Sequence, residues 1–346
     1  MIERDIALFE RPLLSFARST RARMGIISGC AAAVILQSAL SDSFFSLLIA
    51  LAAVAGAFSA ELLVSFLRKQ RLVSDLSALA SALIFTLMLP NTINPAFAFL
   101  GTFFALAVVK GSFGGLGSNW LNPALAGWLF VRFSWPELFS ATLSSSSMVP
   151  IGAIGTSTAD FYGTNAGFLY ANIWRSVYGT VEFLNRTVFQ VFSTEIPSGL
   201  ASFLVNTEPV IIADRGVLAL IAASILICAS MHKFRLSALY LIIYLVLVRF
   251  CGGWTPFIEE GDMFYCLFSG GTLLAAFILC ADPATSPKSM SGKVLTTVCA
   301  ALLSFIFRYL RLELYGAFFA VAAINLICPV IRVEESKRIY NREDSQ

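Results

Sequence analysis

Apolar runs of about 15 to 22 residues follow one another along most of this chain. That length suits α-helices that cross roughly 30 Å of hydrocarbon, and the alternating pattern of a transmembrane β-barrel is missing from the sequence. Hydrophobic residues make up 58% of the 346 residues and charged residues only 13%, far from the composition of a soluble domain. We therefore predict an all-α polytopic membrane protein that lies in a lipid bilayer.

The apolar runs predict about ten transmembrane helices. The predicted spans are residues 24–42, 44–66, 76–90, 96–110, 121–135, 215–231, 235–252, 263–281, 293–310 and 315–332. Lys and Arg mark the cytoplasmic loops of membrane proteins, so the basic clusters at 18–23, 68–71, 233–235 and 337–342 predict that both termini are cytoplasmic. We expect a multi-pass protein of the cell (inner) membrane.

These spans divide the chain into five segments. They are a cytoplasmic N-terminal segment (1–23), a first membrane half (24–135), an extracytoplasmic segment (136–213), a second membrane half (214–332) and a cytoplasmic tail (333–346). Arg308 and Arg311 would face the extracytoplasmic side and are the exception to the charge rule. The first 23 residues lack the apolar core of a removable signal peptide, so the first helix is expected to remain as an anchor.

One span is interrupted at both ends by small or helix-breaking residues. Residues 268–292 read FSGGTLLAAFILCADPATSPKSMSG. Because backbone groups in lipid must be paired, an interrupted helix is tolerated only where it lines a cavity or a bound ligand. The residues predicted to contribute to a site here are Ser269, Gly270, Gly271, Thr272 and Asp282.

A similar pattern occurs in the first half, where residues 76–99 read LSALASALIFTLMLPNTINPAFAF. Both stretches begin with small residues, run apolar for about three turns and stop at a proline, with a second proline shortly after. If each half crosses the membrane an odd number of times, the halves are inverted relative to each other. We therefore predict two inverted five-helix halves with broken helices, and a site between the breaks.

A second unusual stretch, KGSFGGLGSNWLNPALAGWLF at residues 110–130, begins on the predicted cytoplasmic side. Its glycines permit a turn with exposed N–H groups, its asparagines can cap a helix, and Pro123 suits a first helical turn. Such a helix start can bind a phosphate or the polar edge of a ring, although a tight turn that only packs helices remains an alternative. The candidate residues are Gly114, Gly115, Gly117, Asn119 and Asn122.

Ionisable residues inside the predicted spans indicate an ion path or a cofactor contact, because they are costly in lipid. Glu61 is the candidate for an ion path, with snorkelling toward the surface near Arg68 as the alternative. His232 is the only histidine, which excludes bis-histidine haem ligation within the chain, and no CxxC motif supports an iron–sulfur cluster. No basic run is interleaved with aromatic residues, so nucleic acid is not an expected partner.

Four stretches of the sequence resemble a known family. GGLGSNWLNPA, SGGTLLAAFILCADPATSP, SAELLVSFLRKQ and AFFAVAAINLICPVI are similar to the D subunit of the Rnf electron transport complex and to its relative, the B subunit of the sodium-translocating NADH:quinone oxidoreductase. The resemblance implies a component of a redox-driven ion pump that moves electrons from ferredoxin or NADH to a second carrier as Na⁺ or H⁺ crosses the membrane. It also implies ten helices in two related halves, with the other subunits of the complex as partners.

The resemblance further implies two flavins: FMN esterified to a threonine on the extracytoplasmic side by an FMN transferase, and non-covalent riboflavin. The usual flavinylation tetrad is missing from residues 136–213, where Thr180 is the best match by position and Thr164 and Thr194 are alternatives. The SGGT at Thr272 resembles the tetrad but lies within a span. The glycine–asparagine stretch, Ser269 to Thr272 and Asp282 would supply hydrogen bonds near a flavin. No residue is assigned as catalytic, because the redox chemistry belongs to the cofactor.

Two other functions remain open at this point. Inverted five-helix halves with paired broken helices also describe urea and ammonium channels, although the midspan histidines typical of ammonium conduction are missing. A family member without flavin could instead serve as a scaffold subunit, since the tetrad is missing.

Overall fold

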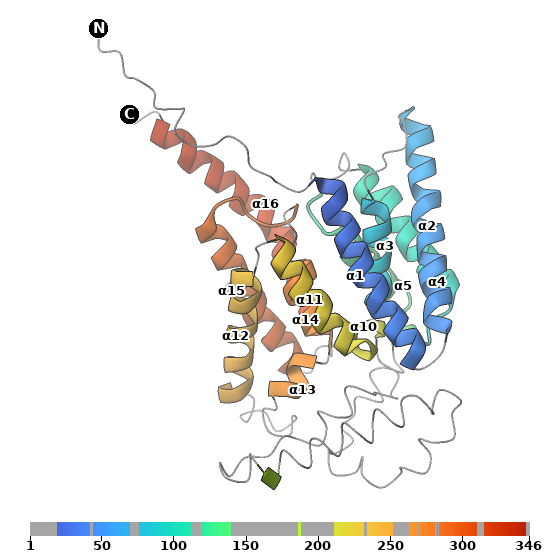
Figure 1. Cartoon of the computed structure of the whole chain (residues 1–346). Helices are drawn as coiled ribbons and strands as arrows, with labels where there is room; N and C mark the ends of the chain where they lie inside the picture. Colours follow the sequence, from blue (N-terminus) through green and yellow to red (C-terminus); the bar gives the residue numbers. More distant parts are fainter. Residues whose placement is uncertain are drawn as a thin grey trace.

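A computed structural model describes residues 19–41, 44–69, 76–112, 119–139, 186–187, 211–231, 234–251, 263–268, 270–280, 282, 284–309 and 315–343 (Figure 1). The first half contains α1 (Thr20–Ser41), α2 (Phe45–Arg68), α3 (Ser77–Leu87), α4 (Pro95–Phe104), the π-helix η1 (Ala105–Lys110), α5 (Pro123–Ser134) and the 3₁₀-helix η2 (Pro136–Phe139). The second contains α10 (Ile212–Arg215), α11 (Val217–Met231), α12 (Phe234–Cys251), α13 (Met263–Phe268), α14 (Thr272–Leu274), the π-helix η7 (Ala275–Leu279), α15 (Met290–Tyr309) and α16 (Gly316–Glu343).

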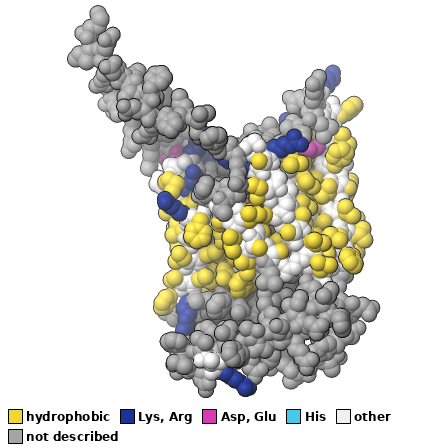
Figure 2. Space-filling model, in the orientation of Figure 1, with side chains coloured by type: hydrophobic (Ala, Val, Ile, Leu, Met, Phe, Trp, Pro, Cys, Tyr) yellow, Lys and Arg dark blue, Asp and Glu magenta, His cyan; other side chains and the backbone are white. Residues whose placement is uncertain are grey.

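The structure confirms an all-α polytopic membrane protein. Within the described residues, α1, α2, α12, α15 and α16 are long and apolar enough to cross a membrane. Shorter apolar helices occupy Ser77–Leu87, Pro95–Lys110 and Ala219–Cys228, which overlap other predicted spans. A band of hydrophobic side chains covers the middle of the molecule, and Lys and Arg gather along its upper rim (Figure 2).

The two halves repeat the same packing order. In the first half α2 packs against α4 and α1 against α3; in the second α12 packs against α15 and α11 against α14 and η7. In Figure 1, α1 begins at the upper end of the molecule and runs downward, whereas its counterpart α11 begins at the lower end and runs upward. This opposite direction agrees with inverted halves, which meet where α1 packs against α11.

Small residues allow the helices of the first half to approach closely. A Cβ atom at Gly56 of α2 would lie 2.4 Å from the backbone oxygen of Phe99 in α4. Aromatic rings join the two halves elsewhere: the buried ring of Trp128 in α5 contacts Phe318 and Phe319 of α16 edge-on, with centroids 5.2 Å and 5.1 Å apart. Edge-to-face packing of this kind favours a fixed arrangement of the two helices.

The last helix continues beyond its predicted end at residue 332. α16 extends to Glu343, with Pro329 inside it. The C-terminal part of α16 is held by Glu335, whose carboxylate accepts a hydrogen bond from the backbone N–H of Lys288 at 3.0 Å and another from the Ser289 hydroxyl. Much of the segment predicted as a tail is therefore helical.

Candidate functional site

The two unusual sequence stretches meet at one end of the bundle. Nδ2 of Asn122, at the start of α5, donates a hydrogen bond to Oδ2 of Asp282 at 2.9 Å, although the residues are 160 positions apart. One belongs to the glycine–asparagine stretch and the other to the interrupted span. The structure thus brings two of the predicted site residues into direct contact across the two halves.

A short motif positions both side chains. The sequence contains Asx-Pro-Ala three times, beginning at Asn94, Asn122 and Asp282. In each case the side-chain oxygen accepts the backbone N–H two residues later, at 2.9 Å, 3.0 Å and 3.0 Å respectively. The intervening proline has no N–H, so the cap bonds the next donor. Because Oδ1 makes the cap, Nδ2 of Asn122 and Oδ2 of Asp282 remain available to each other.

Asn119, three residues before Asn122 in the sequence, is a further polar residue of this stretch. Its side chain is buried, and within the described part of the chain its Oδ1 has no hydrogen-bond partner. A buried acceptor without a donor is costly, so this oxygen is suited to a ligand that carries an N–H or O–H group. The predicted residues Gly114, Gly115 and Gly117 lie outside the described residues.

Arg332 of α16 holds the turn that follows Asp282. Its guanidinium donates to the backbone oxygen of Ser286 from Nε at 3.2 Å and from Nη2 at 2.7 Å, and also to the backbone oxygen of Ala284. The Ser286 hydroxyl in turn donates to the backbone oxygen of Asp282 at 2.6 Å. The planar fork of arginine suits several carbonyls at once, so it fixes the turn and with it the Asp282 carboxylate.

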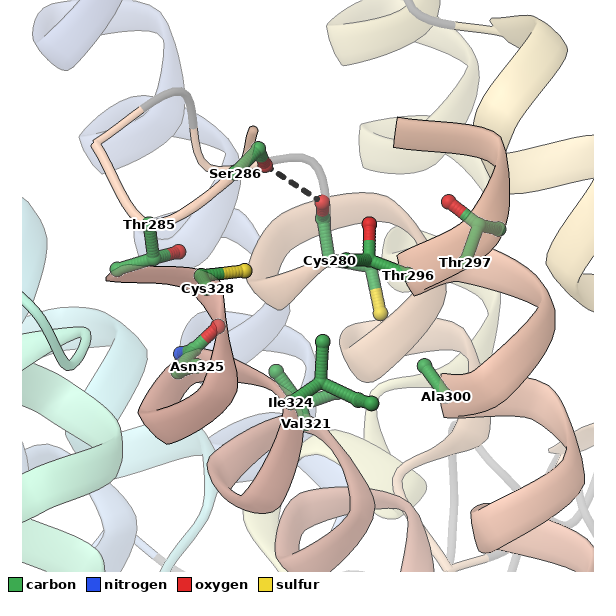
Figure 3. A pocket seen from close by; sticks show the side chains of 10 residues that line it. All are labelled: Cys280, Thr285, Ser286, Thr296, Thr297, Ala300, Val321, Ile324, Asn325 and Cys328. Atoms are coloured by element: carbon green, nitrogen blue, oxygen red, sulfur yellow. Dashed lines mark hydrogen bonds between the residues drawn. The ribbon is translucent and has the colours of Figure 1, made fainter. Parts of the chain in front are cut away.

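A small cavity of ≈ 20 Å³ lies beside this turn, between η7, α15 and α16 (Figure 3). That volume accommodates about one water molecule, so a flavin does not fit in it. Its polar lining comes from hydroxyl, amide and thiol groups. They belong to Cys280, Thr285, Ser286, Thr296, Thr297, Asn325 and Cys328.

The interrupted end of the span forms a second polar site. The backbone N–H groups of Gly270 and Gly271 donate to Oδ2 and Oδ1 of Asp214 at 2.9 Å and 3.2 Å. The buried Thr272 hydroxyl donates to the backbone oxygen of Cys266 at 2.9 Å. Thr272 and Asp282 are ten positions apart in mostly helical chain, or roughly 15 Å along a helix. The predicted residues therefore divide between two sites, and Ser269 lies outside the described residues.

Sequence reasoning missed Asp214, which α10 places against the break. Its carboxylate is buried. The available signal was an acidic residue directly before an apolar run, at the boundary between two predicted segments. An ionisable group at the edge of a span is costly to bury, as one inside a span is, and is a candidate functional residue for the same reason.

Glu61 is paired. Lys110, the last residue of η1, donates to its Oε1 at 2.8 Å and to the hydroxyl of Ser77 at 2.6 Å. Arg68 binds the backbone oxygen of Gly111 nearby. The threonines predicted for covalent FMN, Thr180, Thr164 and Thr194, lie outside the described residues.

The architecture and the broken helices define a polytopic membrane protein in which two inverted halves enclose polar sites. The chain belongs to the NQR2, RnfD, RnfE family, which matches residues 8–341. It is similar to the D subunit of the Na(+)-translocating ferredoxin:NAD(+) oxidoreductase complex of Acetobacterium woodii, with 25% identity over 85% of this chain and 81% of the relative. The D subunits of the ion-translocating oxidoreductase complexes of Shewanella amazonensis (29% identity, 85% and 86% coverage) and Shewanella pealeana (26%, 96% and 97%) are also similar.

Proposed function

We propose that this chain is the D-type membrane component of an Rnf-like ion-translocating electron transport complex, and that it holds flavin and passes electrons as Na⁺ or H⁺ moves. The observation that carries the proposal is the hydrogen bond between Asn122 and Asp282, which joins the two motifs of the family at one site. The partners would be the other subunits of the complex. Membership in a family whose named relatives are subunits of ion-translocating oxidoreductases supports this assignment.

The groups around Asn122 suit the polar edge of a flavin ring. That edge carries an N–H between two carbonyl oxygens, so it needs both an acceptor and donors. The buried Oδ1 of Asn119 is an acceptor that has no donor within the described residues, and Nδ2 of Asn122 is a donor. A bound flavin supplies the electron chemistry, while the protein supplies position and polarity. Asn119, Asn122 and Asp282 would hold a non-covalent flavin such as riboflavin, and Asp282 would orient the Asn122 amide.

A second, covalent flavin is part of the proposal. FMN would be esterified by an FMN transferase to Thr180, with Thr164 and Thr194 as alternatives. The support is the family resemblance and the place of all three threonines in the predicted extracytoplasmic segment. Thr272 is an unsuitable acceptor, because its buried hydroxyl already donates to Cys266.

We place both termini in the cytoplasm of a cell (inner) membrane protein. The basic rim at the end where α1 begins supports this orientation (Figure 2). The Asn122 site would then lie on the cytoplasmic side. Glu61 remains our candidate for an ion path, and Lys110 is the group that a passing cation would have to displace from its carboxylate.

The test compares two asparagines with the same local role. The protein, co-expressed with its partner subunits, is purified in detergent, and the flavin released on denaturation is quantified by chromatography. Asn122→Ala and Asp282→Ala are expected to lower the released riboflavin per protein at least about tenfold, because a buried polar ligand contact is lost. Asn94→Ala removes an equivalent helix cap that does not contact Asp282, and this variant should release as much riboflavin per protein as the unmodified protein.

If Asn122→Ala releases as much riboflavin per protein as the unmodified protein, the proposed flavin site at Asn122 is wrong. Absence of both released and covalent flavin from the unmodified protein would favour a scaffold subunit. Covalent flavin alone would restrict the proposal to the extracytoplasmic site.

A further inference from the structure

The break between α13 and α14 leaves both backbone N–H groups and backbone oxygens without their usual helical partners. On one side of it, the backbone oxygen of Cys266 accepts from Nη1 of Arg308 at 3.3 Å. On the other, the N–H groups of Gly270 and Gly271 donate to the carboxylate of Asp214. An acid from α10 therefore pairs the freed donors, and a base from α15 pairs a freed acceptor. Backbone groups inside a membrane require such partners.

Both charged side chains are buried. Asp214 is 3% exposed and Arg308 is 8% exposed. Arg308 also donates to the hydroxyl of Tyr244 at 3.3 Å. A single buried charge is strongly unfavourable, whereas two opposite charges with satisfied hydrogen bonds are tolerated. This accounts for Arg308, which the loop charge rule left unexplained.

The break has little freedom to rearrange. Gly270 and Gly271 both have φ of 68°, in the region that favours glycine. A Cβ atom on Gly271 would lie 2.3 Å from Cζ of Phe318 in α16. Asp214 and Arg308 must therefore bind the break in this one backbone conformation.

The short helix that carries Asp214 also reaches the break of the first half. The N–H of Ile212 donates to the backbone oxygen of Leu89 at 3.0 Å, two residues after the end of α3. This contact is the isolated bridge between Pro90 and Ile211. The segment 211–215 thus contacts the interrupted regions of both halves.

We propose that Asp214 and Arg308 are a matched pair of positioning residues that hold the second-half break, and that the balance of their charges is what the break requires. Neutralising Asp214 leaves Arg308 as an uncompensated buried cation. Because broken helices line the transport sites of membrane proteins, that charge would repel a coupling cation. This consequence for transport rests on the proposed function; the pairing itself does not.

The first experiment is a double-mutant cycle on the thermal unfolding of the purified subunit. Asp214→Asn and Arg308→Gln are each expected to lower the unfolding midpoint by at least about 5 °C, because each leaves one buried charge. The double variant should recover at least about half of the summed loss. Glu61→Gln combined with Arg308→Gln is the matched control and should be additive. Additive losses in the Asp214 and Arg308 cycle would overturn the pairing.

If a single variant does not accumulate, Asp214→Glu and Arg308→Lys replace it, because they keep the charges while they change the reach and, at Arg308, the donor geometry. These variants should be destabilised less than the neutral ones. If they lower the unfolding midpoint as much as the neutral variants do, charge is not what the break requires.

The second experiment measures ions taken up per electron transferred by the assembled complex in vesicles. Asp214→Asn should lower this ratio at least about fivefold, while electron transfer per assembled complex stays within about twofold of the unmodified rate. Asp214→Asn combined with Arg308→Gln should have a higher ratio of ions per electron than Asp214→Asn alone. A purely structural role would lower both quantities together, and that result would overturn the transport consequence. An unmodified complex that moves no ions would refute the proposed function, whereas the thermal cycle would still decide the pairing.

Discussion

Lys110 and Glu61 form an ion pair at 2.8 Å that connects the end of η1 to α2. Their side chains are only 13% and 21% exposed, and the same ammonium group contacts the Ser77 hydroxyl at the start of α3. One side chain therefore ties three helical segments together next to the glycine–asparagine stretch. Replacing Lys110 removes all of these contacts and leaves Glu61 without this counter-charge.

We predict that Lys110→Met lowers the free energy of unfolding by about 2 kcal/mol, because a partly buried carboxylate loses its charged partner. Denaturant unfolding of the purified subunit measures the loss. Lys69→Met, at the exposed end of α2, is the control and should change stability by less than about 0.5 kcal/mol. Equal losses in the two variants would show that the pair contributes nothing specific.

Two glycines in long helices should respond to alanine with opposite signs. At Gly56 a Cβ atom would approach the backbone oxygen of Phe99 to 2.4 Å, whereas at Gly29 it would meet nothing within 4 Å. Gly56→Ala is therefore expected to destabilise the subunit by about 1–3 kcal/mol through overpacking between α2 and α4. Gly29→Ala should stabilise it by up to about 1 kcal/mol.

Thermal unfolding of both glycine variants in the same detergent decides between these signs. If Gly56→Ala unfolds at the same temperature as the unmodified subunit, the close crossing of α2 and α4 is wrong.

Covalent flavin should depend on one threonine. After co-expression with an FMN transferase and denaturing electrophoresis, Thr180→Ala is expected to lose the fluorescent band of the unmodified protein. Thr164→Ala and Thr194→Ala should keep it. Thr272→Ala should also keep the band, because that hydroxyl is buried inside the bundle and donates to Cys266. A band lost only in Thr164→Ala or Thr194→Ala would move the attachment site.

The sequence alone predicts where apolar helices lie, because the hydrophobicity and length of a run are local properties. The span predicted at 44–66 corresponds to α2 at Phe45–Arg68, and the one predicted at 96–110 to α4 and η1 at Pro95–Lys110. The structure brings Asn122 and Asp282, one from each stretch, into contact, and their role in a binding site stays a prediction. Asparagine and Asp-Pro interrupt the apolar runs, so their positions in the sequence already indicate both stretches.

Long-range partners could not be predicted in the same way. The loop charge rule treats Arg308 as a residue facing the extracytoplasmic side, whereas the structure buries it against Tyr244 and Cys266. Asp214 lies in a four-residue helix that has no hydrophobic periodicity to reveal it. Both roles depend on a break formed by residues far away along the chain. A single sequence does not specify such pairs.

Replacing Arg332 by lysine should lower the local stability of the turn that follows Asp282. Its guanidinium contacts the backbone oxygens of Ser286 and Ala284 at once, and a single ammonium group cannot reproduce that fork. Arg332→Lys is expected to lose about 1–2 kcal/mol of local stability, so the amides of residues 284–289 should exchange with deuterium roughly 5–30 times faster.

The same variant should release riboflavin more readily, because the turn positions Asp282 beside Asn122. Hydrogen exchange followed by mass spectrometry measures the turn, and flavin chromatography measures the site. Arg235→Lys, at an exposed position, is the matched control. Faster exchange with unchanged flavin content would separate the turn from the flavin site, whereas unchanged exchange would mean that Arg332 does not hold the turn.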